Sequence, residues 1–174
     1  MALIPAVAAA QIWEHYRDAA SLDASGNPIP SPPTGDFPAN WATAYDTYAA
    51  GGEVPGAQNQ GGNKIIIEAF LRGLVSKDNV IEFAEVLANY WATVAVIPGA
   101  PAHGGTSVIS VTNDAASKVG LFESAIRASI TESRSEPFFQ HFIENVQNIA
   151  VSQVIWSVTE DTPSGPVTFP ENIV

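Results

Sequence analysis

The side chains best suited to chemistry are the three histidines of the sequence, His15, His103 and His141. A metal site needs ligands that converge, and no two of these histidines are spaced to share a helix face. His141-x-x-Glu144 reverses the order of the Glu-x-x-His motif of di-iron bundles, and no second copy exists. Glu144 also falls outside the apolar stripe of its segment, so we predict a solvated helix face. The sequence predicts no metal and no other cofactor.

Glu82 and Glu85 form a second candidate group, because two acids three residues apart could share acid–base work. Such work needs one carboxyl in an apolar pocket that raises its pKa. Both residues fall on the polar side of the helix predicted around them, which favours a solvated surface. A serine nucleophile is not indicated either, since the Gly-x-Ser-x-Gly turn is missing.

Two glycine-rich stretches, Gly61-Gly62-Asn63-Lys64 and Gly104-Gly105-Thr106-Ser107, invite comparison with phosphate-binding loops. The first lacks both the Gly-Lys-Ser/Thr spacing and a preceding strand, so a plain connector is the better interpretation. The sequence has no cysteine, which excludes disulfides, thiolate nucleophiles and cysteine-ligated zinc. We therefore predict that the protein is not an enzyme.

Aromatic side chains crowd the first fifty residues, around a proline-rich stretch. Tyr and Trp bury a large area and keep a polar tip, which suits both cores and interfaces, and the sequence leaves these two roles open. The predicted contact residues are these aromatics together with two residues near the C-terminal end: Trp13, Tyr16, Trp41, Tyr45, Tyr48, Pro166 and Phe169.

The elements that must position these side chains are mostly helical. Val80, Phe83, Leu87 and Tyr90 recur at steps of three and four, which places them on one face of a helix. Helices are predicted over about residues 5–22, 39–50 and 64–75, from a Ser76 or Asp78 cap to Pro98, from a Thr112 or Asn113 cap past Ile130, and from Ser135 to about Val158.

Proline and glycine divide these helices. Loops are predicted near residues 23–38, 51–63 and 97–111, with at most a short extended segment at Val108–Val111. Residues 162–174 are predicted to form an extended C-terminal tail, because they contain three prolines and a glycine. The expected fold is mostly α, a bundle-like single helical domain over residues 1–161.

A weak internal similarity accompanies this pattern. The Glu–Arg pair of residues 68–72 resembles that of residues 123–127, and residues 83–89 resemble residues 142–148. A duplicated helical hairpin would explain both similarities. Chance is the favoured explanation, because amphipathic helices share the same period.

Composition limits the partners. Eighteen acidic and seven basic residues give a net charge of −11, and no basic cluster is available to neutralise nucleic-acid phosphates or anionic lipid. The N-terminal ten residues lack the basic region of an export signal, so intracellular assembly is expected. We expect other protein subunits as partners, in a homo- or hetero-oligomer, with no nucleic acid and no membrane.

The start Met1-Ala-Leu-Ile-Pro5, the Pro/Gly loops and the Ala-rich, cysteine-free helices resemble, in overall texture, small virion structural proteins of tailed bacteriophages. That resemblance implies a neck, connector or decoration component. The expected function is thus a structural protein that builds or decorates a multi-subunit particle through helix packing and loop or tail arms. Two alternatives stay open: a helical ligand binder or enzyme with a loop-assembled site at His103, and an acidic adaptor that binds a basic protein.

Overall fold

The computed structural model describes residues 3–20, 22–23, 25–27, 35–73, 79–130 and 135–173. The described residues form six α-helices, one short 3-10 helix and six β-strands. The helices are α1 (Pro5–Ala20), α2 (Phe37–Ala49), α3 (Lys64–Gly73), α4 (Val80–Ala92), η1 (Ala115–Lys118), α5 (Val119–Ser129) and α6 (Glu136–Ser152). The strands are β1 (Glu53–Val54), β2 (Ala57–Asn59), β3 (Val96–Pro98), β4 (Ser107–Asn113), β5 (Trp156–Thr162) and β6 (Gly165–Glu171).

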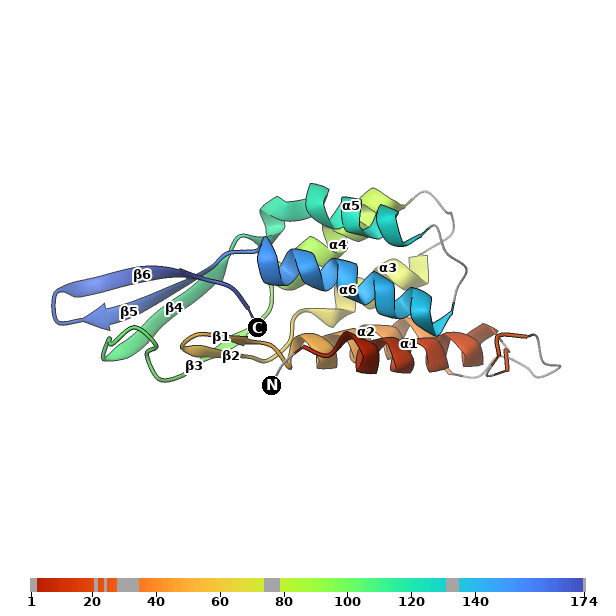
Figure 1. The fold of residues 1–174 in the computed structure, drawn as a ribbon, viewed down its shortest axis with the longest axis horizontal. Coiled ribbons are helices and arrows are strands. Elements are labelled where there is room, and N and C mark those ends of the chain that lie inside the picture. The colour runs from red at the N-terminus through yellow and green to blue at the C-terminus, as the bar shows by residue number, and fades with distance from the viewer. Residues whose placement is uncertain are drawn as a thin grey trace.

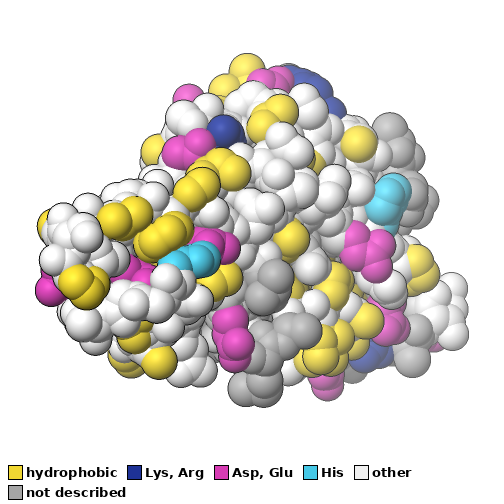
Figure 2. All heavy atoms as spheres, turned by 60° about the vertical axis from the view of Figure 1, so that its left-hand side comes forward, with side chains coloured by type: hydrophobic (Ala, Val, Ile, Leu, Met, Phe, Trp, Pro, Cys, Tyr) yellow, Lys and Arg dark blue, Asp and Glu magenta, His cyan; other side chains and the backbone are white. Residues whose placement is uncertain are grey.

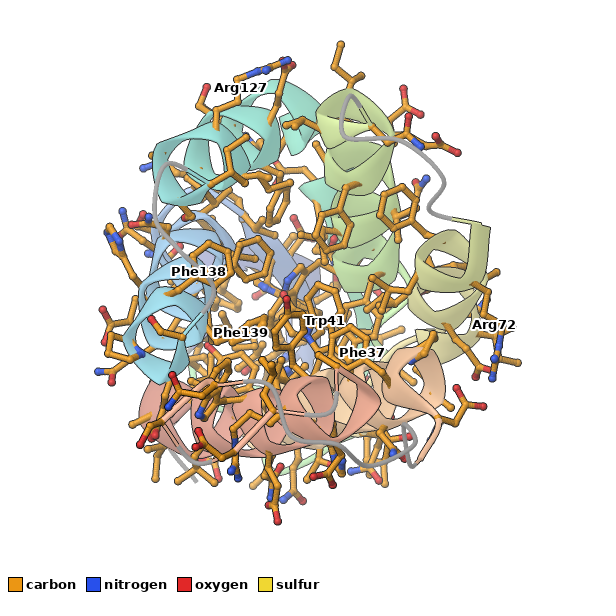
Figure 3. The ribbon with its side chains drawn as sticks, turned by 90° about the vertical axis from the view of Figure 1, so that its right-hand side faces the viewer. Phe37, Trp41, Arg72, Arg127, Phe138 and Phe139 are labelled. Atoms are coloured by element: carbon orange, nitrogen blue, oxygen red, sulfur yellow. The ribbon has the colours of Figure 1, made fainter. Side chains whose placement is uncertain are left out.

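Along the described chain, the order of two helices followed by two strands occurs three times. Each helix packs against the next α-helix in the chain, and α1 also packs against α6, so the helices close into a ring. Figure 3 shows this ring along the helix axes, with the labelled aromatic side chains inside it and Arg72 and Arg127 outside. Because each helical pair reverses the chain, α2, α4 and α6 all end on the same side, where every strand emerges (Figure 1).

The centre of the ring is an aromatic triad made by Trp41, Phe83 and Phe142, one from each second helix of a pair. The ring centroids of Trp41 and Phe83 are 5.5 Å apart, those of Phe83 and Phe142 5.8 Å, and those of Trp41 and Phe142 6.1 Å. All three side chains are buried. Offset and edge-to-face aromatic pairs at these distances stabilise a core beyond the area they bury. The triad therefore ties α2, α4 and α6 together at one point.

The strands form two antiparallel sheets of three strands, ordered β1-β2-β3 and β4-β5-β6. In the second sheet Val111 of β4 lies opposite Val158 of β5, which lies opposite Phe169 of β6. The ladder between β4 and β5 shifts register between Val108 and Ser110, which marks a bulge at Ile109.

The prediction of a mostly α, bundle-like fold is wrong, because the two sheets make this a mixed α and β structure. The loops predicted near 51–63 and 97–111 overlap four of the strands, and β4 includes the extended segment predicted at Val108–Val111. The tail predicted from 162 contains β6, which is paired along its length with β5. The helix predicted to reach Val158 ends at Ser152. Val154 and Val158 continue the helical spacing, but with Trp156 they also alternate every second residue, and all three are buried.

The other predicted helices are present, but two of their bounds are wrong. The helix predicted to reach Pro98 ends at Ala92, and the predicted caps Thr112 and Asn113 belong to β4, so that α5 begins only at Val119.

The Ser135 side chain accepts a hydrogen bond from the Phe138 N–H at 3.2 Å, which confirms the predicted start of α6. The predicted stripe at residues 80, 83, 87 and 90 is buried. The proposed caps Ser76 and Asp78 lie outside the described residues. Residues 28–34, which make up most of the proline-rich stretch, also lie outside them.

Candidate functional site: the β arm

Both sheets project from one end of the helical ring as a β arm, which we define as residues 53–59, 96–113 and 156–171 (Figure 1). All seven Lys and Arg residues lie outside the arm, and its acidic residues are Glu53, Glu160, Asp161 and Glu171. Figure 2, which brings the arm forward, shows apolar side chains scattered over it and no Lys or Arg. Interface cores are depleted of charged residues in the same way.

The two faces of the β4-β5-β6 sheet differ sharply in chemistry. Side chains that lie opposite one another across the strands share a face. One face, the hydroxyl face, carries Ser107, Ser110, Thr112, Ser157, Thr159 and Thr168 together with one acid, Asp161, and has Pro166 and Pro170 at the edge. The Thr159 and Thr168 hydroxyl oxygens lie 2.9 Å apart, which confirms that they are neighbours. This face is open to solvent, since its residues are exposed or half-buried.

The opposite, inner face packs against the rest of the arm. Val158 and Trp156 are buried on it, and the turn between β1 and β2 lies against it. A Cβ added to Gly56 would come 3.3 Å from Val108 Cγ2 and 3.6 Å from Val158 Cγ1. Gly56 also has φ of +82°, which a residue with a side chain rarely adopts. The close approach of this turn therefore depends on glycine.

The β6 edge is protected against pairing with a further strand. The backbone carbonyls of Asp161 and Ile155 accept the N–H groups of Thr106 and Asp114, which flank β4. The backbone N–H and C=O groups of odd-numbered β5 residues therefore point toward β4, and those of even-numbered residues point toward β6. The β6 residues paired with these even-numbered residues are odd-numbered. The backbone groups of Pro166, Thr168 and Pro170 therefore point away from β5, along the open edge of the sheet. Proline has no N–H, so of these three positions only Thr168 offers a donor. Prolines on an edge strand are a common defence against unwanted sheet extension.

A strap, residues 99–106, crosses the inner face and is held by Glu160. This side chain is buried, and its carboxylate accepts the backbone N–H groups of Ala102 at 2.7 Å, His103 at 3.1 Å and Gly105 at 3.0 Å. Desolvation acts to raise the pKa of Glu160. The three N–H donors and the nearby imidazole outweigh it and hold that pKa below its ordinary value. An ionised Glu160 is thus the anchor of the strap.

His103 makes the second attachment of the strap. Its ring stacks on Phe169 with centroids 4.0 Å apart, and its Nε2 lies 2.6 Å from Oε1 of Glu171. Both partners belong to β6. The His103 side chain is 30% exposed, at the surface of the arm. Stacking and a carboxylate contact account for this histidine, so its geometry is that of a structural attachment.

Apolar side chains are exposed on the arm and where it joins the ring. They are Ile97, Ile109 and Val167, with Ile155 just before β5, and their exposure ranges from 37% to 54%. A shallow, open depression lies beside the turn of β1 and β2, lined by residues 53–58 with Gly99 and Ala100. It carries one ionisable group, Glu53, and therefore offers no constellation for acid–base or nucleophilic chemistry.

The structure places the aromatic residues of the predicted contact patch mainly inside the ring. Trp13, Trp41, Tyr45 and Tyr48 are buried, and Tyr16 is half-buried and stacks on Trp13 at 5.8 Å. Of the two roles left open by the sequence, these side chains have the core role in this chain. Burial raises the pKa of both Tyr45 and Tyr48, so neither phenol ionises at neutral pH.

The two C-terminal residues predicted for the interface do lie on the arm. Pro166 is exposed at the β6 edge, and Phe169 is half-buried beneath His103. The hydroxyl face and Glu160 were missed by the sequence reasoning. Alternating hydroxyl residues at 110, 112, 157 and 159 were the available signal, since a period of two indicates a strand.

The remaining candidates for chemistry stay apart. Glu82, Glu85 and Glu144 are exposed on helices, as predicted. Gly62 donates its N–H to Asp46 at 2.9 Å, so the first glycine stretch is part of a structural turn. Within the described residues, no three His, Asp or Glu side chains are grouped closely enough to hold a metal ion.

None of the helices in the described part of the chain combines the length and apolar composition needed to cross a bilayer. Comparison with known proteins adds no relative: no family model, curated protein or solved structure matches this chain.

Proposed function

We propose that this protein is a structural subunit that joins a multi-subunit particle through its β arm. The observation that carries the proposal is the arm itself: a projecting sheet with one open hydroxyl face, exposed aliphatic residues and no Lys or Arg. Covering hydroxyl groups costs less than covering ionised groups, provided that the partner supplies hydrogen bonds to them. The helical ring serves as the scaffold that holds this surface out.

The resemblance in overall texture to tailed-bacteriophage structural proteins suggests a virion as the particle. In that setting the partners are other protein subunits, and the contact is made by a preformed sheet. This differs from arms that become ordered only on binding, because the strands of the arm are already paired in the single chain. A preformed surface reduces the conformational entropy lost on association.

The test compares charge placed on the arm with the same charge placed on the ring. The double variant Thr112→Lys/Thr168→Lys adds two positive charges to the hydroxyl face, at exposed positions. The matched control Thr47→Lys/Ser124→Lys adds the same charge to exposed positions of α2 and α5. We expect the arm variant to remain folded, by circular dichroism, and to be lost from particles or oligomers measured by light scattering. The proposal fails if both variants assemble as the wild type does.

An adaptor that binds a basic protein remains a second candidate, because the charged groups of the arm, apart from His103, are all acidic. The salt dependence of binding separates the two functions. Capture of a basic partner should weaken steadily as salt is raised, since exposed charges are screened. Assembly through the hydroxyl face and the aliphatic residues should persist at high salt.

A further inference from the structure

The strap over the inner face is held differently at its ends and in its middle. At the ends, Gly99 donates its N–H to Gly56 at 2.8 Å, and Thr106 donates its N–H to Asp161 at 2.8 Å. These are ordinary backbone bonds. The middle of the strap, from Ala100 to Gly105, is small, polar or glycine-rich, and most of it is exposed.

The middle is therefore held mainly by ionisable side chains. Glu160 binds three of its N–H groups, and His103 binds Glu171 and covers Phe169. A Cβ on Gly105 would come 2.8 Å from Cβ of Glu160, so the strap lies directly on the strand. Such a segment, with few apolar contacts of its own, belongs to the part of a fold that opens most easily.

We propose that the strap is a latch whose opening uncovers the inner face of β5 and β6, and that the Glu160 carboxylate, with the His103–Glu171 contact beside it, sets how firmly it closes. The surface uncovered would include Phe169 and extend the exposed Val167, giving an apolar strip for a neighbouring protein subunit. The use of that strip in assembly rests on the proposed function. The latch itself does not.

The pH dependence of the latch comes from Glu160. Because the pKa of Glu160 is held below its ordinary value, its stabilising bonds are fully present above that ordinary value and are lost as the pH falls through the lowered one. The contact between His103 and Glu171 adds a second attachment of the strap, to β6. The remaining acids near the strap are Glu53, beside Gly99 and Ala100, and Asp161, whose backbone carbonyl accepts the Thr106 N–H. Neither the strap nor β4 carries an acidic residue, a lysine or an arginine.

Amide hydrogen exchange measures this latch directly. The amides of Ala102, His103 and Gly105 should lose protection as the pH falls through the lowered pKa of Glu160, after correction for intrinsic exchange rates. The Glu171→Gln variant should lower the protection of these amides about tenfold, the effect of losing one charge-assisted bond. The Glu123→Gln variant removes an ion pair with Arg127 on α5 and should leave the profile unchanged.

The Glu160→Gln variant provides a second test of the latch, because it keeps the size of the side chain and removes its charge. We expect faster exchange of the same three amides at neutral pH, while amides of α4 keep their protection. Protection that does not change with pH, or that falls equally in the Glu171→Gln and Glu123→Gln variants, would overturn the latch. If the exchange profile appears as expected but no condition yields assembly, the latch stands and the proposed function fails.

Discussion

The helical ring and the β arm are built on opposite principles. The ring is stabilised by large apolar side chains that meet at its centre, and every Lys and Arg of the described residues lies on one of its helices. The arm has little core of its own and depends on strand pairing, glycine turns and a buried carboxylate. Stability and contact therefore belong to separate regions. The ring provides most of the stability of the fold, and the arm provides the surface for contact.

The largest expected effect comes from the aromatic triad. The Phe83→Ala variant should lower the free energy of unfolding by about 3–5 kcal/mol, because it leaves a cavity at the point where α2, α4 and α6 meet. Chemical denaturation measures this change. The Phe169→Ala variant, on the arm, should cost only about 1 kcal/mol for its lost stacking with His103. Equal losses in the two variants would contradict the division between ring and arm.

A smaller effect is expected where the ring meets the arm. Tyr90 donates its hydroxyl hydrogen to Asp46 at 2.7 Å, and Gly62 donates its N–H to the same carboxylate. Burial, followed by the hydrogen bond to Asp46, raises the pKa of Tyr90, so the phenol stays protonated as a donor. The Tyr90→Phe variant should lower the free energy of unfolding by about 1–3 kcal/mol, measured by denaturation. The Thr93→Ser variant is a suitable nearby control, since it retains the hydroxyl that bonds to the Tyr90 carbonyl.

The smallest effect should come from the hydroxyl face. The Thr112→Val variant keeps the strand-forming shape of the side chain and should change the free energy of unfolding by less than about 0.5 kcal/mol. Thermal unfolding checks this expectation. A large loss of stability would mean that the face is needed for folding, and the comparison between a stabilising ring and a contacting arm would then have to be redrawn.

The helices could be predicted because their signals are local. The stripe at Val80, Phe83 and Leu87 follows from the helix period, and the Ser135 cap lies beside the amide that it binds. The strands could not be separated from loops in the same way. Strand pairing joins residues far apart in sequence, and Val154, Trp156 and Val158 fit a helix or a strand until their partners in β4 and β6 are known.

The candidate site was harder still to foresee. The sequence indicates His103 as a candidate for chemistry, but its partners Glu171 and Phe169 belong to β6, which lies more than fifty residues further along the chain. The aromatics Trp41 and Tyr45 were expected in either a core or an interface. Their side-chain type allows both, and only the closing of the helical ring put them inside.

The sequence by itself therefore determined where most helices lie, the Ser135 cap that begins α6, the acidic charge and the lack of cysteine chemistry, because each of these depends on neighbouring residues or on composition. The tertiary structure decided that the helices close into a ring, that the Pro/Gly-rich stretches pair as strands and that Glu160 becomes a buried anchor. These features depend on long-range contacts, and a carboxylate can be buried only where distant backbone N–H groups are brought to it.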